Sequence, residues 1–66
     1  MHVFQINDMT CKHCEASVTK AVKEVDTQAE VTIDLATHTA KVNSNKECSV
    51  IEKAIIDAGF TPTRQL

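Results

Sequence analysis

The chain has 66 residues, a formal charge of −2 with neutral histidines, and only two aromatic residues. A chain of this length forms one small domain with a marginal core, which leaves no room for a deep catalytic pocket. The negative charge argues against nucleic acid as a partner, and two phenylalanines provide no stacking platform for bases.

The hydrophobic period changes once in the first part of the chain, at Lys12. Phe4 and Ile6 alternate with polar residues and predict a short, half-buried strand. From Lys12 the apolar residues recur at i, i+4, i+7, i+8 and i+11, which predicts a helix. Its apolar stripe consists of Cys14, Val18, Ala21, Val22 and Val25. Residues 26–28 form the turn after it.

A hairpin is predicted next. Val31, Ile33 and Leu35 alternate with polar residues, which is the clearest strand signal in the chain. Residues 36–39 form the hairpin turn, although they lack an Asn-Gly signal. Ala40 and Val42 lie on the returning strand, and residues 43–46 form a polar loop.

The last part predicts a helix and an edge strand. Ser49 and Glu52 have the capping-box spacing, with Ser49 as N-cap. The apolar stripe of this helix consists of Ile51, Ala54, Ile55 and Ala58. Gly59 is placed to end the helix in a left-handed turn. Residues 60–66 are extended, and Pro62 confines them to the edge of a sheet because proline cannot donate to a ladder.

The predicted order is strand, helix, strand, strand, helix, strand. It favours an α+β fold, a ferredoxin-like βαββαβ sandwich with a four-stranded antiparallel sheet and two helices on one face. In this topology, turns 36–39 and 59–62 lie at the same end as the junction between the first strand and the first helix. Loop 43–48 lies at the opposite end.

Cys11 and Cys14 flank this junction. Unpaired backbone N–H groups at a helix N-terminus favour thiolate over thiol. Soft sulfur ligands select Cu(I), Zn(II) or iron–sulfur chemistry over hard cations. A closed structural zinc site needs four ligands, and no second cysteine pair or histidine pair follows. A redox dithiol is compatible with the spacing, but thioredoxin-like proteins are larger and usually carry small or proline residues at the positions of Lys12 and His13.

The segment Met9–Cys14 reads MTCKHC, and Ala58, Gly59 and Phe60 follow the second helix. With the order of elements, this pattern resembles the heavy-metal-associated domain over nearly the whole chain, and within it bacterial copper chaperones of the CopZ type. The resemblance implies that residues 1–66 form a single heavy-metal-associated domain. It also implies that Cys11 and Cys14 bind Cu(I) in near-linear geometry. The ion then passes to a cytosolic domain of a copper-transporting P-type ATPase through shared three-coordinate thiolate intermediates.

A two-coordinate ion leaves an open flank where an incoming thiolate can attack before an existing Cu–S bond breaks. The same openness allows two copies to share thiolates in a copper-bridged homodimer. We expect Cys11, on the looser turn, to be more exposed than Cys14 and to exchange more readily.

Four residues flank the pair. Met9 is expected to pack beneath the loop rather than to bind metal, because methionine usually fills core gaps, and the resemblance gives it the same role. Lys12 adds positive charge beside a bis-thiolate centre or is an ordinary solvated lysine. His13 points to solvent, where it tunes thiol acidity, acts as a weak ligand in a copper-bridged dimer, or has no role. Phe60 covers the metal end with an apolar ring where bacterial relatives commonly carry Tyr.

Other residues carry weaker signals. Asp8 stands where the family usually has Gly, which puts a negative charge beside the loop and bears on loop geometry and partner preference. His38 lies in the hairpin toward the metal end and is expected to be merely exposed. Cys48 is expected to be a core or surface thiol at the opposite end, and His2 carries no signal.

We therefore predict a stand-alone carrier of Cu(I) that is not an enzyme. Residues 1–6 show no basic leader before an apolar run, and no apolar run in the chain is long enough to cross a bilayer. Three cysteines cannot all pair within the chain, which argues against a secreted disulfide framework. These observations predict a cytoplasmic protein without membrane insertion. Three alternatives stay open: a metal-binding domain of a copper ATPase, disfavoured by the Met1 start and the short length; a chaperone for mercury, zinc or another soft metal; and a thiol oxidoreductase.

Overall fold

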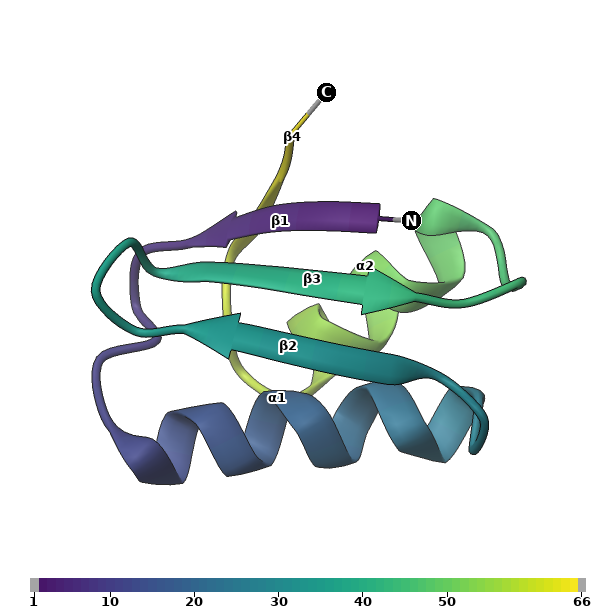
Figure 1. The fold of residues 1–66 in the computed structure, drawn as a ribbon, viewed down its shortest axis with the longest axis horizontal. Coiled ribbons are helices and arrows are strands. Elements are labelled where there is room, and N and C mark those ends of the chain that lie inside the picture. The colour runs from purple at the N-terminus through teal and green to yellow at the C-terminus, as the bar shows by residue number, and fades with distance from the viewer. Residues whose placement is uncertain (1, 66) are drawn as a thin grey trace.

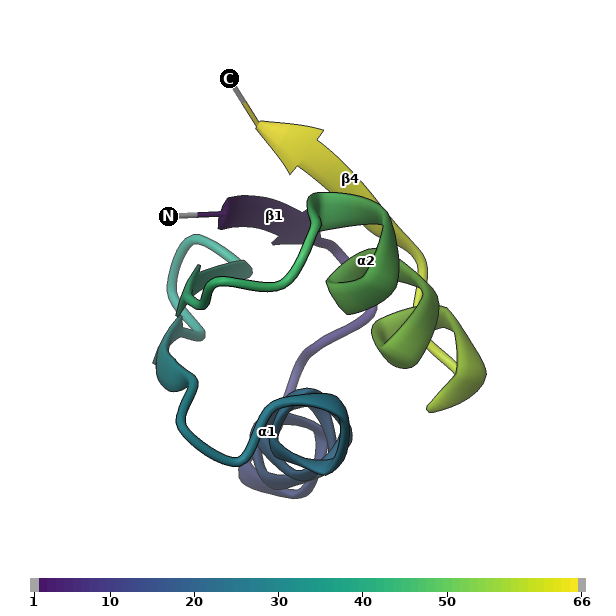
Figure 2. The ribbon, with the colours of Figure 1, turned by 90° about the vertical axis from the view of Figure 1, so that its right-hand side faces the viewer.

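The structure is a computed structural model that describes residues 2–65. The elements are β1 (His2–Ile6), α1 (Lys12–Val25), β2 (Glu30–Asp34), β3 (Thr39–Asn43), α2 (Cys48–Asp57) and β4 (Pro62–Gln65). The strands form one antiparallel sheet in the order β2-β3-β1-β4, and both helices lie on the same side of it (Figures 1 and 2). The predicted ferredoxin-like α+β fold is confirmed. Across residues 2–65, no helix has the length and apolar character that crossing a membrane requires.

The core lies between the sheet and the two helices. Strands β1 and β3 each contribute alternate residues, as a half-buried sheet requires, and each helix contributes one stripe. The fully buried members of these elements are Phe4, Ile6, Ala40, Val42, Val18, Val22, Ile51 and Ile55. Val25, the last member of the predicted α1 stripe, is 37% exposed because it lies in the last turn of the helix.

The β2–β3 hairpin lies where the sequence predicts it, but β2 ends at Asp34, one residue earlier than expected. The Asp34 side chain explains the difference. Its Oδ1 accepts hydrogen bonds from the backbone N–H groups of Ala36 (2.9 Å) and Thr37 (3.4 Å), which turn the chain away from the ladder. His38 completes the turn with a positive φ of 54°.

The predicted capping box at the start of α2 is wrong. The N-cap is Glu47, whose carbonyl accepts from the backbone N–H of Val50 (3.0 Å) and of Ile51 (3.3 Å), and Ser49 lies inside the helix. Glu52 does not reach back to the N-terminus. Its carboxylate instead accepts two hydrogen bonds from the guanidinium of Arg64 on β4, at 2.9 and 3.1 Å. Because the Glu52 carboxylate is bound to Arg64 on the neighbouring strand, it is not available for the capping box.

The end of α2 is formed as the sequence predicts. Gly59 has a φ of 100°, its N–H donates to the carbonyl of Ile56 (2.9 Å), and the N–H of Phe60 donates to the carbonyl of Ile55 (3.3 Å). These are the two bonds of a Schellman motif. The motif directs Phe60 back toward the core, where its half-buried ring packs. It also starts β4, which lies at the sheet edge as the proline predicts.

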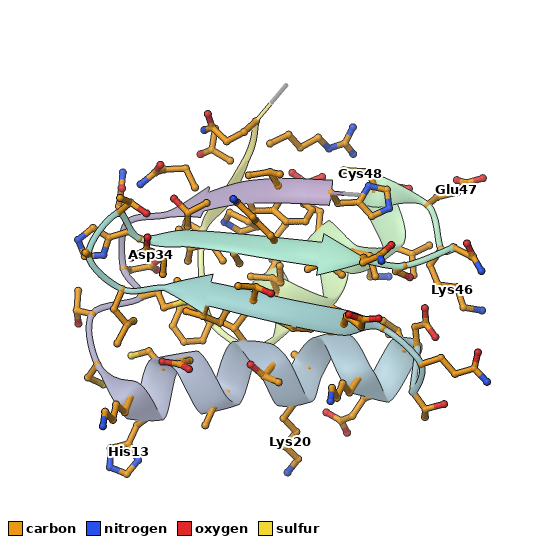
Figure 3. The ribbon with its side chains drawn as sticks, in the orientation of Figure 1. His13, Lys20, Asp34, Lys46, Glu47 and Cys48 are labelled. Atoms are coloured by element: carbon orange, nitrogen blue, oxygen red, sulfur yellow. The ribbon has the colours of Figure 1, made fainter. Side chains whose placement is uncertain are left out.

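The two ends of the domain are as expected. At one end, Ile6 N–H donates to the carbonyl of His38 (2.7 Å), so the end of β1 lies against the hairpin turn. At the other end, the His2 ring is 2.8 Å from the carbonyl of Lys46. Figure 3 shows Lys46 and Cys48 at one end of the molecule and His13 at the other.

A substitution of Gly59 by Ala tests the left-handed turn. No atom lies within 4 Å of the position that a Cβ would occupy, so the cost comes from the backbone conformation alone. We expect Gly59→Ala to lower the free energy of unfolding by about 1–2 kcal/mol. Urea denaturation measures this change, and an unchanged stability would contradict the assigned conformation.

Candidate metal centre

Met9 fixes the segment between β1 and α1 to the hydrophobic core. Its side chain is fully buried, and its N–H donates to the carbonyl of Ile6 (3.1 Å) across the turn at residues 7–8. The predicted packing role of Met9 is confirmed by this burial. The following residues, Thr10 and Cys11, are exposed.

Cys11 and Cys14 lie on either side of the start of α1. Cys11 is the N-cap residue, with extended backbone angles and a carbonyl that accepts from Glu15 N–H (3.0 Å). Cys14 belongs to the first helical turn, is half-buried and packs against the core. Both thiols are free, and their Sγ atoms are 3.3 Å apart. The expectation that Cys11 is the more exposed thiol is confirmed.

The sulfur separation determines which geometry the pair can offer. With metal–sulfur bonds of about 2.3 Å, an ion that bridges sulfurs 3.3 Å apart makes an S–metal–S angle of about 90°. A linear arrangement needs a separation of about 4.6 Å, twice the bond length. The sulfurs must therefore move apart by more than about 1 Å to hold an ion linearly. Cys14 is held by the helix and the core, so the exposed N-cap residue is the one that can move.

The surroundings of Cys14 favour its thiolate. Hydrogen bonding from the backbone of Thr10 lowers the pKa of the Cys14 thiol, and a hydrogen bond with the Cys11 side chain lowers it further. Partial burial and the negative charge of Asp8 act in the opposite direction. The net shift is downward, as a metal ligand requires, because the thiolate is the form that binds soft ions.

The other predicted site residues lie around the pair without forming a larger ligand cluster. Among residues 2–65, no group of three or more His, Cys, Asp or Glu side chains lies close enough together to hold a metal ion, so the two thiols have no third protein ligand of these types beside them. Lys12 and His13 are exposed, and Figure 3 shows the His13 ring pointing away from the sheet. Phe60 is half-buried and packs on the core. Cys48 is half-buried at the start of α2, at the far end as predicted.

Sequence reasoning missed two hydrogen bonds that hold this segment. His38 is half-buried rather than merely exposed, and its Nδ1 donates to the carbonyl of Met9 (2.8 Å). Asp8 Oδ1 accepts from the backbone N–H of Thr61 (3.3 Å), which ties the segment to the turn before β4. A hairpin position alone did not identify His38, because its contact is with a residue 29 positions away.

Comparison with known proteins agrees with the fold and the motif. The profile of the heavy-metal-associated domain matches residues 3–61, and the chain belongs to this family. A COP-associated protein of Helicobacter felis is 33% identical over 57 residues, which cover 83% of this chain and 86% of that protein. A copper-transporting ATPase 1 of Rhizobium meliloti (strain 1021) is 37% identical over 59 residues, 86% of this chain. The chain spans only 7% of the length of that ATPase.

Solved structures show the same relationship. The crystal structure of a gold binding protein superposes with a TM-score of 0.94 at 34% identity, covering 98% of this chain and 100% of the other. The copper chaperone Atx1 from Synechocystis PCC6803 gives a TM-score of 0.91 at 30% identity, covering 92% and 97%. The resemblance to copper chaperones of the CopZ type is confirmed.

The effect of Asp8 on Cys14 is testable. Asp8→Asn keeps the oxygen that accepts from Thr61 and removes the negative charge that raises the thiol pKa. We expect the pKa of Cys14 to fall, so that its alkylation by iodoacetamide begins at lower pH than in the unsubstituted protein. The measurement is the rate of Cys14 modification against pH, located by peptide mass spectrometry.

Glu47→Gln is the matched control, since it removes one negative charge at the opposite end, where Glu47 lies in Figure 3. A profile for Asp8→Asn that coincides with that of Glu47→Gln would show that the Asp8 charge does not act on Cys14.

Proposed function

We propose that this protein is a cytoplasmic carrier of Cu(I), a binding module and not an enzyme, with Cys11 and Cys14 as the metal ligands. The observation that carries the proposal is the geometry of the pair. Two free thiols lie 3.3 Å apart at a helix N-terminus, one of them exposed and the other with a lowered pKa. Thiolates of this kind bind soft ions such as Cu(I).

The same geometry supports transfer as well as binding. Two thiolates leave a soft ion with an unoccupied coordination position. Because Cys11 is exposed to solvent, a partner's thiolate can approach the ion on that side. Transfer then proceeds by ligand exchange, in which an incoming thiolate bonds to the ion before Cys11 is released. The ion stays bound to sulfur throughout, and no redox step is required.

The proposed recipient is the cytosolic metal-binding domain of a copper-transporting P-type ATPase. Support comes from the similarity to a segment of a copper-transporting ATPase and to a COP-associated protein. A recipient domain with a thiol pair like Cys11 and Cys14 would offer the ion the same kind of ligand, which is what transfer by ligand exchange requires. The same similarity supports the alternative that the chain is itself a metal-binding domain of such an ATPase. An open site also allows a copper-bridged homodimer.

Copper is proposed over other soft ions because of the named copper proteins among the relatives. Sulfur ligands alone do not choose between Cu(I), Hg(II) and Zn(II), and a gold binding protein has nearly the same fold. A chaperone for another soft metal is therefore the main alternative. A thiol oxidoreductase is a second alternative, favoured by one observation, the short distance between the two free sulfurs.

The test is an anaerobic titration of the reduced protein with Cu(I) against a strong Cu(I) chelator, and with Zn(II) separately. We expect about one Cu(I) per chain, bound far more tightly than Zn(II). Cys11→Ser and Cys14→Ser should each weaken Cu(I) binding by at least about a hundredfold, because loss of a direct ligand exceeds the 10- to 100-fold typical of an outer partner. Cys48→Ser is the matched control and should leave the affinity unchanged.

Three results would contradict the proposal. Copper binding that survives the Cys11 and Cys14 substitutions, or is lost with Cys48, would place the ligands elsewhere. Zn(II) binding that equals or exceeds Cu(I) binding would assign the protein to another metal. Turnover in an insulin-reduction assay without measurable Cu(I) affinity would support the oxidoreductase.

A further inference from the structure

The hairpin turn holds His38 in an unusual backbone conformation. Within residues 2–65, His38 is the only residue other than glycine with a positive φ, at 54°. Side chains with a Cβ disfavour this region, so the surrounding structure has to maintain it. Residues held in such conformations cluster at functional sites, and the bonds that His38 makes show which site is concerned.

Two hydrogen bonds connect His38 to the segment before the cysteines. Its carbonyl accepts from the N–H of Ile6 (2.7 Å), and its Nδ1 donates to the carbonyl of Met9 (2.8 Å). The acceptor at Met9 is a carbonyl, so Nδ1 carries a proton. Ile6 and Met9 are also joined to each other by a backbone bond of 3.1 Å. The segment 6–9 is therefore fixed to the hairpin at both of its ends.

The other side of the candidate metal centre is fixed by α1. Cys14 lies in the first helical turn, which begins with the bond from Glu15 N–H to the carbonyl of Cys11. Between Met9 and that turn, only Thr10 and the side chain of Cys11 lie outside these two anchors, and both residues are exposed. The separation of the sulfurs, 3.3 Å in this structure, can therefore be adjusted by a short segment held between two fixed points.

We propose that His38 is a positioning residue for metal binding. The hydrogen bond from its Nδ1–H to the carbonyl of Met9 fixes the segment just before Cys11, so that the Cys11 thiol faces Cys14 when the ion binds. This inference rests on the proposed function. Without the bond, segment 6–9 samples conformations in which Cys11 does not face Cys14, and only the remaining fraction binds metal. The apparent affinity then falls in proportion to that fraction.

Three variants separate positioning from general stability. His38→Ala removes the bond. His38→Asn retains it, because the Asn amide nitrogen occupies the place of Nδ1 on the side chain and Asn tolerates the left-handed region. His2→Ala is the matched control, since the His2 ring makes a bond of equal length, 2.8 Å, to the carbonyl of Lys46 at the opposite end.

Two measurements are made on each variant under conditions where it is folded: amide hydrogen exchange at Ile6 and Met9, whose N–H groups donate the backbone bonds of segment 6–9, and Cu(I) affinity by chelator competition. For His38→Ala we expect faster exchange in this segment and Cu(I) binding about fivefold weaker, the value of one ordinary hydrogen bond. His38→Asn should restore both. His2→Ala should change neither, even if it lowers global stability.

Exchange and affinity unchanged in His38→Ala, or changed equally in His2→Ala, would overturn the inference while leaving copper binding intact. If the unsubstituted protein binds no Cu(I), the proposed function fails, and the exchange data still decide whether His38 positions the segment. Faster exchange in His38→Ala that His38→Asn restores supports the inference, and unchanged exchange overturns it.

Discussion

The candidate metal centre depends on how the chain leaves the middle of the sheet. β1 is an inner strand, between β3 and β4, and the chain must pass from it to α1 on the helical face within residues 7–11. The fully buried Met9 fixes this crossing, since its side chain belongs to the core while its backbone belongs to the loop. A polar residue at this position would remove the buried side chain that holds the crossing against the core, and only the hydrogen bonds of His38 and Asp8 would then position the segment before the two thiols.

The two cysteines differ in exposure and in packing because they lie at different distances along the chain from this anchor. Cys11 ends an exposed segment, whereas Cys14 is part of a helix that packs through Val18 and Val22. One thiol is therefore less constrained by its surroundings than the other. A site of this kind binds an ion less rigidly than a four-ligand cage does, and it leaves space for a third thiolate. The same arrangement that makes the pair a weak structural site is the one that the proposed transfer requires.

The fold was predictable because its signals are local and agree with one another. Each local signal specifies one structural feature: the period change at Lys12 a helix, the alternation around Ile33 a strand, and the glycine after Ala58 a helix end. Together these signals are compatible with few topologies. The two thiols were predictable because their spacing is itself local. The bonds of His38 and Asp8 were not, because each joins residues that are distant in sequence and adjacent only in the fold. The capping box failed for the same reason, since Arg64 is twelve residues from the side chain that it recruits.

The proposed function requires that the sulfurs of Cys11 and Cys14 hold a soft ion and leave room for one more ligand. X-ray absorption at the copper edge, on monomeric protein loaded with less than one equivalent of Cu(I), measures the ligands directly. We expect two sulfur neighbours and no nitrogen, with a third sulfur appearing when an external thiol is added. A centre with a histidine nitrogen, or with three or four protein ligands in the monomer, would contradict it.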